Sequence, residues 1–305
     1  MKNIYLVFIF ILIIAGGAIA FLLHSPPDKT VKTNKIKVVT SFYPLYFFAS
    51  AIGAEKAIVQ NITPVGAEPH DYEPTPSDIA AIEKSDIVIL NGGRLEAWGE
   101  DIKKNIDPAK IITAGEGLTT QTVLEEGQTI TDPHVWLSPS LAKQMVRKIA
   151  SSFETVDPNN KAYYETNTAK LLNDLDALNQ AYQKGFTSCT RKDFVTSHAA
   201  FGYLASTYQL HQIPISGVSP DSEPSPKQLA EVTKLVKERG INVIFFEALV
   251  SPKLAQTIAR EVGAKTMVLD PIEGVSDEDV KLGKNYLTIM QENLKNLEIA
   301  LSCKQ

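Results

Sequence analysis

The sequence predicts an α/β protein with two lobes, each a mostly parallel sheet flanked by helices, joined by one long spine helix. Short β-rich runs alternate with helical patterns, which is typical of parallel sheets with crossover helices. The alternation stops across residues 159–186, where no Pro occurs, and then starts again. A chain of 305 residues with 44% hydrophobic residues can supply cores for about two domains.

The first half alternates strands and helices along the chain. We expect strands at 37–40, 57–62, 86–90 and 110–113, and helices at 43–52, 77–84, 95–105 and 138–154. Gly53 is placed to end the first helix, and Ser77 is a candidate N-cap for the second. The stretch 119–132 reads as a loop.

Residues 159–186 predict one long helix. Apolar side chains recur at four-, three- and four-residue steps, at Leu171, Leu175, Leu178 and Tyr182. A helix of roughly 28 residues is about 40 Å long, which exceeds what a crossover inside one lobe needs. We interpret it as a spine between two lobes; the alternative is a long peripheral helix of one large domain.

The second half repeats the alternation. We expect strands at 193–196, 212–215, 241–246 and 265–269, and helices at 199–208, 226–239, 252–262 and 282–301. Gly240 and Gly263 follow the ends of two of these helices. The predicted organisation is an N-terminal lobe at 36–157, a linking helix at 158–187 and a C-terminal lobe at 188–305.

The N-terminus carries an export signal. Residues 4–23 form an apolar run long enough to span a bilayer, and Ala18-Ile19-Ala20 also fits a cleavage site. Residues 1–23 are therefore a signal peptide or an N-terminal membrane anchor, and 24–35 a polar tether. We expect the protein in the periplasm or on the outer face of the cytoplasmic membrane, where an uncleaved helix would hold it.

Charge and cysteine content narrow the classes of protein further. The net charge is −5 and no basic stripe occurs, which argues against a general nucleic-acid-binding role. Cys189 and Cys303 are the only cysteines. In an exported chain they could form one disulfide, or they could be two buried thiols.

Three histidines and one aspartate lie where a parallel sheet binds ligands. His70, His134 and His198 lie in or beside loops that follow predicted strands, and Asp270 follows the last strand. Ligands of open parallel sheets bind outside the carboxyl ends of the strands. Three imidazoles and one carboxylate form a set suited to Zn²⁺. Taken singly, each residue also fits an ordinary surface or turn position.

Six segments, in order, resemble those of the zinc and manganese substrate-binding proteins of ABC transporters, the ZnuA/AdcA/TroA-like family. The resemblance covers residues 36–303. The segments are PVGAEPHDYEPTP (64–76), DPHVWLSP (132–139), TSHAAFGYLA (196–205), GVSPDSEPSPKQL (217–229), IFFE (244–247) and LDPIEG (269–274).

The resemblance implies one metal ion between two lobes. His70, His134 and His198 match the first three ligands of the family, and the manganese branch typically has Glu at the third position. Asp270 matches the carboxylate of the last segment. Glu273, three residues further on, is the alternative carboxylate, and water is a third candidate for the fourth position.

The metal preference follows from the donors. Imidazole suits Zn²⁺, whereas Mn²⁺ sites usually hold more carboxylate oxygens, so Mn²⁺ is the less favoured cargo. Glu68, Asp71, Asp132 and Glu247 are candidates to accept the second N–H of a ligand histidine. The stretch 119–132 lacks the His-rich loop of many zinc-branch members and in this respect is similar to the manganese branch.

These features predict a monomeric, exported solute-binding protein that captures Zn²⁺ between two lobes and delivers it to an ABC permease. It is not expected to be an enzyme, since the sequence contains neither HExxH nor GxSxG. Three alternatives remain: the same role for Mn²⁺ or another divalent metal, an adhesin, and an exported zinc hydrolase.

Overall fold

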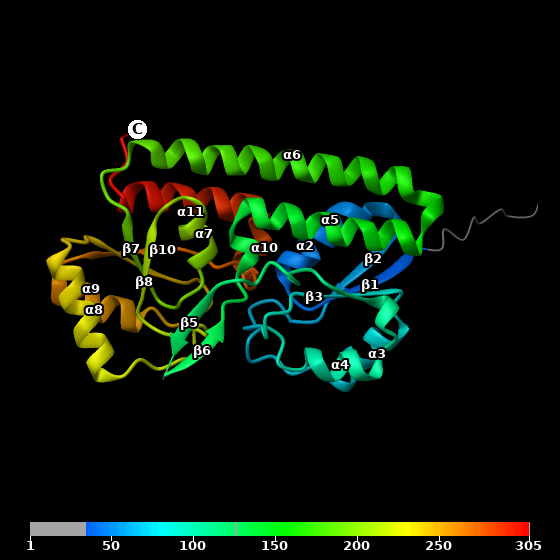
Figure 1. Ribbon diagram of the computed structural model, residues 1–305, viewed down its shortest axis with the longest axis horizontal. Coiled ribbons are helices and arrows are strands. Elements are labelled where there is room, and N and C mark those ends of the chain that lie inside the picture. The colour runs from blue at the N-terminus through cyan, green and yellow to red at the C-terminus, as the bar shows by residue number, and fades with distance from the viewer. Residues whose placement is uncertain (1–34, 126, 305) are drawn as a thin grey trace, which may run out of the picture. The chain divides into compact units, whose positions relative to one another are not determined.

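The computed structural model describes residues 35–125 and 127–304 (Figure 1). The expected signal peptide or anchor at 1–23 and nearly all of the tether lie outside the described residues. Among the described residues, no helix combines the length and apolar character that crossing a membrane requires.

The first sheet is parallel and has the strand order β2-β1-β3-β4. Its strands are β1 (Ile36–Thr40), β2 (Ala57–Asn61), β3 (Ile87–Leu90) and β4 (Ile111–Thr113). All four residues of β3 are buried, because alternate side chains enter two different cores on the two faces of the sheet. The near-continuous apolar run of this strand is the sequence signature of that burial.

The second sheet repeats the topology of the first. It consists of β7 (Asp193–Thr196), β8 (His211–Pro214), β9 (Val243–Phe246) and β10 (Lys265–Val268), in the order β10-β9-β7-β8. In each sheet the first strand lies between the second and the third, so the order reverses there and leaves a crevice at the carboxyl ends. The predicted fold class is confirmed.

Short sequence matches accompany the repeated topology. V-T-S ends the first strand of each sheet, at 39–41 and 195–197. D-x-E-P-[TS]-P occurs between the second strand and the next helix, at 71–76 and 221–226. These matches are too short to stand out in the sequence, and the equivalent positions in the two sheets reveal them.

Helices cover the sheets and differ from the predicted ones mainly at their ends. They are α2 (Tyr43–Gly53), α3 (Pro76–Lys84), α4 (Gly99–Asn105), α5 (Pro139–Val156), α6 (Lys161–Gly185), α7 (Gly202–Thr207), α8 (Pro226–Glu238), α9 (Lys253–Val262), α10 (Asp277–Lys281) and α11 (Tyr286–Ala300). Thr75, and not Ser77, caps α3, because it forms a capping box with Asp78. The predicted helix at 282–301 begins only at Tyr286, where Asn285 caps it.

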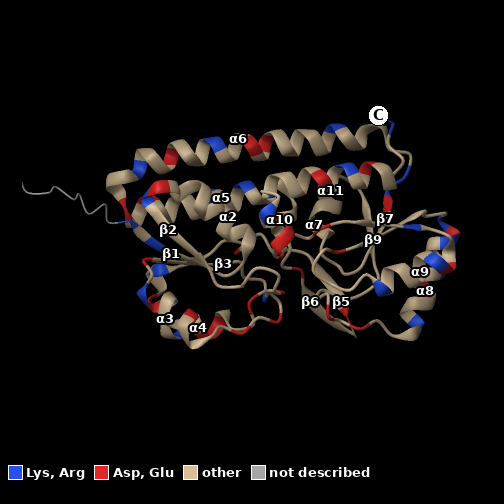
Figure 2. Ribbon diagram, turned by 180° about the vertical axis from the view of Figure 1, so that it is seen from behind, with Lys and Arg blue, Asp and Glu red and all other residues tan. Residues whose placement is uncertain are grey.

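The long helix α6 connects both halves of the molecule, and Figure 1 shows it running along both. Asn167 donates from Nδ2 to the carbonyl of Ile52 in α2 at 3.0 Å, and Tyr182 donates to the carbonyl of Met290 in α11 at 2.7 Å. Leu171, Leu175, Leu178 and Tyr182, the predicted stripe, are all buried. Figure 2 shows charged residues of both signs along this helix.

A β-hairpin occupies part of the stretch that the sequence analysis treats as a loop. Strands β5 (Thr122–Glu125) and β6 (Gln128–Thr131) pair antiparallel, and Gly127 takes a positive φ of 79° in the turn. Tyr203 of α7 holds the base, accepting from the Gln121 amide at 2.9 Å and donating to the Asp132 carbonyl at 3.0 Å. The hairpin is therefore tied to the second half of the chain.

Cys189 and Cys303 form a disulfide across a sequence separation of 114 residues, as the first of the two alternatives predicts. Replacing both cysteines by serine should lower the free energy of unfolding by about 2–4 kcal/mol, because the bridge restricts the unfolded chain. Denaturant unfolding with and without reductant would measure this. Reductant should destabilise only the parent; equal midpoints for the oxidised parent and the variant would contradict the expectation.

Candidate metal centre

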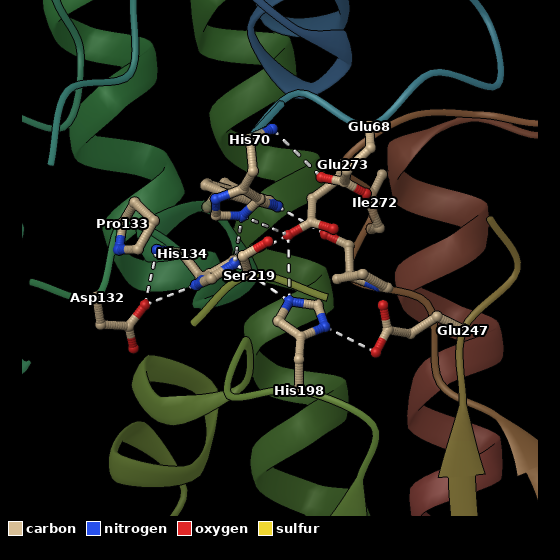
Figure 3. Close-up of polar contacts among 12 residues, drawn as sticks. Glu68, His70, Asp132, Pro133, His134, His198, Ser219, Glu247, Ile272 and Glu273 are labelled. Atoms are coloured by element: carbon tan, nitrogen blue, oxygen red, sulfur yellow. Dashed lines mark hydrogen bonds and ion pairs between the residues drawn. The ribbon is translucent and has the colours of Figure 1, made fainter. Parts of the chain in front are cut away.

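Three histidines and one glutamate converge at the carboxyl ends of the two sheets (Figure 3). One potential ligand atom from each of His70, His134, His198 and Glu273 lies within 4.8 Å of the others. His70 and His134 come from loops of the first half, after β2 and β6, and His198 and Glu273 follow β7 and β10. The structure thus brings together the three histidines that the sequence analysis selects.

The three rings turn their Nε2 atoms toward one carboxylate oxygen. Glu273 Oε1 lies 3.3 Å from Nε2 of His70, 2.9 Å from that of His134 and 3.3 Å from that of His198. The His134 Nε2 atom lies 3.3 Å from Nε2 of His70 and 3.4 Å from Nε2 of His198. Four donor atoms therefore surround one small volume.

Two further carboxylates fix the orientation of two rings. His134 Nδ1 lies 2.7 Å from Asp132 Oδ1, and His198 Nδ1 lies 2.7 Å from Glu247 Oε1. A carboxylate can only accept, so both Nδ1 atoms donate, and each Nε2 faces the centre. Asp132 and Glu247 thus lie where the sequence analysis expects partners of ligand histidines.

The other two expected partners are placed differently. Glu68 accepts weakly from the backbone amide of His70 at 3.4 Å, not from its ring. Burial, followed by the nearby charge of Glu273, raises the pKa of Glu68 to about 9. Asp71 is exposed, and its side-chain partner is Asp221, whose contact raises the pKa of Asp71.

Asp270, the expected fourth ligand, is not a member of this group; the group's one carboxylate is that of Glu273, the alternative that the sequence analysis names. Asp270 Oδ1 accepts from the backbone amide of Ile272 at 2.7 Å, and Asn293 bonds both the amide and the carbonyl of Asp270. Ile272 has a φ of 59°, a left-handed conformation that is costly for a β-branched residue. Asp270 stabilises this turn, which directs Glu273 toward the histidines.

The centre is buried and strongly polarised. The side chains of His134 and His198 are fully buried, and that of Glu273 is 2% exposed. Burial by itself lowers the pKa of His198, but the charges of Glu247 and Glu273 outweigh it and hold that pKa well above its usual value. Burial likewise opposes ionisation of Glu273, yet the charge on His198 and hydrogen bonds from all three histidines hold its pKa well below its usual range.

Known proteins share this architecture. Residues 38–300 match the family described as ZnuA, "Zinc-uptake complex component A periplasmic". The chain is 40% identical over 286 residues to the high-affinity zinc uptake system protein ZnuA of Bacillus subtilis, covering 90% of each chain. It is 39% identical to the zinc-binding lipoprotein AdcA of Streptococcus pneumoniae, covering 87% of this chain but only 56% of that relative.

Solved structures agree with the sequence relatives. The Zn(II)-bound ZnuA-like domain of Streptococcus pneumoniae AdcA is similar with a TM-score of 0.75 and 40% identity, covering 88% of this chain and 99% of that one. The laminin-binding protein Lmb of Streptococcus agalactiae, described as having adhesin and metal-transporting activity, has a TM-score of 0.79 and 35% identity, with the same coverage. With the matched segments, the repeated sheets and the convergent histidines in agreement, this chain belongs to the ZnuA family of zinc-uptake binding proteins.

Proposed function

We propose that this protein is an exported binding protein that captures Zn²⁺ and delivers it to an ABC permease in the membrane. The observation that supports this best is the convergence of three imidazole Nε2 atoms and one carboxylate oxygen in a buried volume between the two sheets. Because one chain supplies all four donors, the protein needs no second copy to bind the ion, and we expect it to act as a monomer.

The donor set supports zinc as the cargo. Three neutral imidazoles and one carboxylate provide the four N and O ligands that Zn²⁺ takes in tetrahedral sites. Mn²⁺ favours sites richer in carboxylate, water and carbonyl oxygens, and at similar ligands binds more weakly than Zn²⁺. The ion would replace the protons and hydrogen bonds that hold the four side chains together in its absence.

The same set supports capture over catalysis. A catalytic zinc site keeps a coordination position for water, whereas a site with four protein ligands is closed. His70, His134, His198 and Glu273 together supply all four positions. An exported zinc hydrolase would have to give up one of these ligands.

Metal content would test the proposed function. The chain without residues 1–35 would be stripped of metal, offered equimolar Zn²⁺ and Mn²⁺, and weighed by native mass spectrometry. One zinc per chain is the expected result. Retention of manganese in the presence of zinc would overturn the choice of cargo. A chain that keeps neither metal would contradict the proposal and favour the adhesin activity described for the Streptococcus agalactiae relative.

Zinc affinity should fall as the pH falls. The pKa of His134 lies above its usual value, because hydrogen bonds to Asp132 and Glu273 outweigh the opposing effect of burial. The pKa of His198 is raised in the same way by Glu247 and Glu273. The metal-free centre therefore holds protons near neutral pH that zinc must displace. Calorimetry in buffers of different ionisation enthalpy should detect release of about one proton or more per zinc ion, and weaker binding at about pH 6 than at about pH 8. Affinity independent of pH over this interval would contradict the expectation.

A further inference from the structure

Glu125, at the end of β5, joins the β5–β6 hairpin to a loop of the second half of the chain. Its Oε2 atom accepts from the backbone amide of Val218 at 3.1 Å, and its Oε1 atom accepts from Ser222 Oγ at 2.6 Å. We call residues 216–222, which follow β8, the entrance loop. One half-buried carboxylate thus connects segments about 90 residues apart in sequence.

Gly217 makes this close contact possible. A Cβ atom at this position would collide with the carboxylate of Glu125. The φ of Gly217 lies outside the left-handed region, so the backbone itself does not require glycine there. The Gly217 carbonyl also accepts from the amide of Ala199 at 2.8 Å, next to His198. The entrance loop is therefore connected to the turn that carries a metal ligand.

The hairpin and the entrance loop border a cavity that reaches the metal centre. The cavity has a volume of about 350 Å³, and its lining includes His70, Arg94, Glu125, Ser219 and Ser222. The His70 side chain is 8% exposed, whereas those of His134 and His198 are fully buried. Solvent therefore reaches the centre from the His70 side, where Ser219 of the entrance loop lines the same cavity; Figure 3 draws both residues.

The two ends of the hairpin are held in different ways. At its base, the hydroxyl of Tyr203 forms hydrogen bonds with Gln121, which precedes β5, and with Asp132, which follows β6. The side chain of Asp132 in turn accepts a hydrogen bond from the ring of His134. Near its tip, the hydrogen bonds between the entrance loop and the described part of the hairpin are both accepted by the side chain of Glu125. Loss of that carboxylate would release the tip while the base and the ligand His134 stay in place.

We propose that Glu125 is a latch that holds the hairpin against the entrance loop and thereby limits the rate at which the metal ion enters and leaves. Glu125 is a positioning residue and not a ligand. The inference rests on the proposed function, because it assumes that the centre exchanges a metal ion. It predicts that breaking the latch changes exchange rates in both directions more than it changes equilibrium affinity.

Rates of zinc exchange would test the latch. Zinc-loaded protein would be mixed with excess chromogenic chelator in a stopped-flow instrument, and uptake by metal-free protein would be followed separately. Glu125→Ala should accelerate both release and uptake by about tenfold, the effect of losing hydrogen bonds to a charged group. Glu125→Gln should retain much of the parent behaviour, since an amide can still accept from Val218 and donate to Ser222.

Gly217→Ala tests the latch without altering Glu125. The added methyl group would displace the carboxylate, so exchange should accelerate as in Glu125→Ala. Two controls separate other causes. Glu223→Ala removes an exposed carboxylate beside the entrance loop, and Thr129→Ala alters an exposed side chain of the hairpin. Both should exchange zinc at the parent rate.

Hydrogen exchange of the metal-free protein gives a readout that does not depend on zinc. Amides of β5 and β6 should exchange faster in Glu125→Ala than in the parent and the controls. Release rates within about twofold of the parent, or unchanged protection of the hairpin, would overturn the latch. Equal acceleration by Glu223→Ala would overturn it too, since loss of charge would then be the cause. A parent that binds no zinc would instead overturn the proposed function, whatever the variants do.

Discussion

Replacing Glu273 by alanine is expected to weaken zinc binding by about a hundredfold or more. Loss of a residue that only hydrogen-bonds a metal ligand already lowers metal affinity by about 10–100-fold, and Glu273 would be a ligand itself. Glu273 Oε1 lies within 3.3 Å of all three Nε2 atoms, so its removal takes away the one anionic donor of the set. The site would then hold three imidazoles and water. Competition against a chelator of known affinity would measure the change.

Asp270→Asn is the matched control. Asp270 lies three residues away and is similarly buried, but its carboxylate bonds the amide of Ile272. Asparagine keeps an oxygen that can accept from that amide, so the turn and the position of Glu273 should survive. We expect zinc affinity near that of the parent. The opposite order of effects, with Asp270→Asn the more damaging variant, would contradict the assignment of Glu273 as the fourth ligand.

His198→Ala should also reduce zinc affinity by about a hundredfold or more, by the same comparison with ligand partners. The ring supplies one of the four donors and has no exposed surface. Its loss leaves the buried carboxylate of Glu247 without its hydrogen-bond partner, so the thermal midpoint should fall as well. Calorimetric titration would report the affinity, and far-UV circular dichroism would verify that the fold is retained.

His211→Ala is the control that shows whether the loss of any histidine, and not only of a ligand, weakens zinc binding. His211 begins β8 and pairs with Asp193 at the amino end of β7, whereas the centre lies at the carboxyl ends of the strands. Its side chain is 70% exposed. This variant should bind zinc like the parent. Comparable losses of affinity in the two variants, or full affinity in His198→Ala, would remove His198 from the ligand set.

The alternation of strands and helices predicts most of the fold, because the spacing of apolar residues along the chain shows which side chains of each element are buried. The apolar run of β3 marks a strand covered on both faces, and the stripe on α6 marks the side that packs on both halves. The prediction of a loop at 119–132 does not include the hairpin of β5 and β6, although polar and apolar residues alternate in T-V-L-E and Q-T-I-T on either side of Gly127. Both strands are short and partly exposed, so their apolar signal is weak.

Helix ends were predicted less accurately, because caps depend on single side chains. Ser77 and Thr75 both precede the apolar pattern of α3, but only Thr75 lies three residues before Asp78, with which it forms a capping box. Asn285 similarly separates α11 from α10 by capping at a position inside the expected helix. In both cases the decisive signal was present in the sequence as the spacing of a cap and its partner.

The sequence alone predicts the class of fold and the three histidines that the structure brings together, because strand ends and residue chemistry are local properties. The tertiary structure, and not the local sequence, selects Glu273 over Asp270 as the carboxylate that lies beside these histidines. That choice depends on the left-handed turn at Ile272 and on the bonds of Asn293 in α11, 23 residues away. The direction of a side chain is set by backbone angles and by partners distant in sequence, and neither is recorded in the residue types next to it.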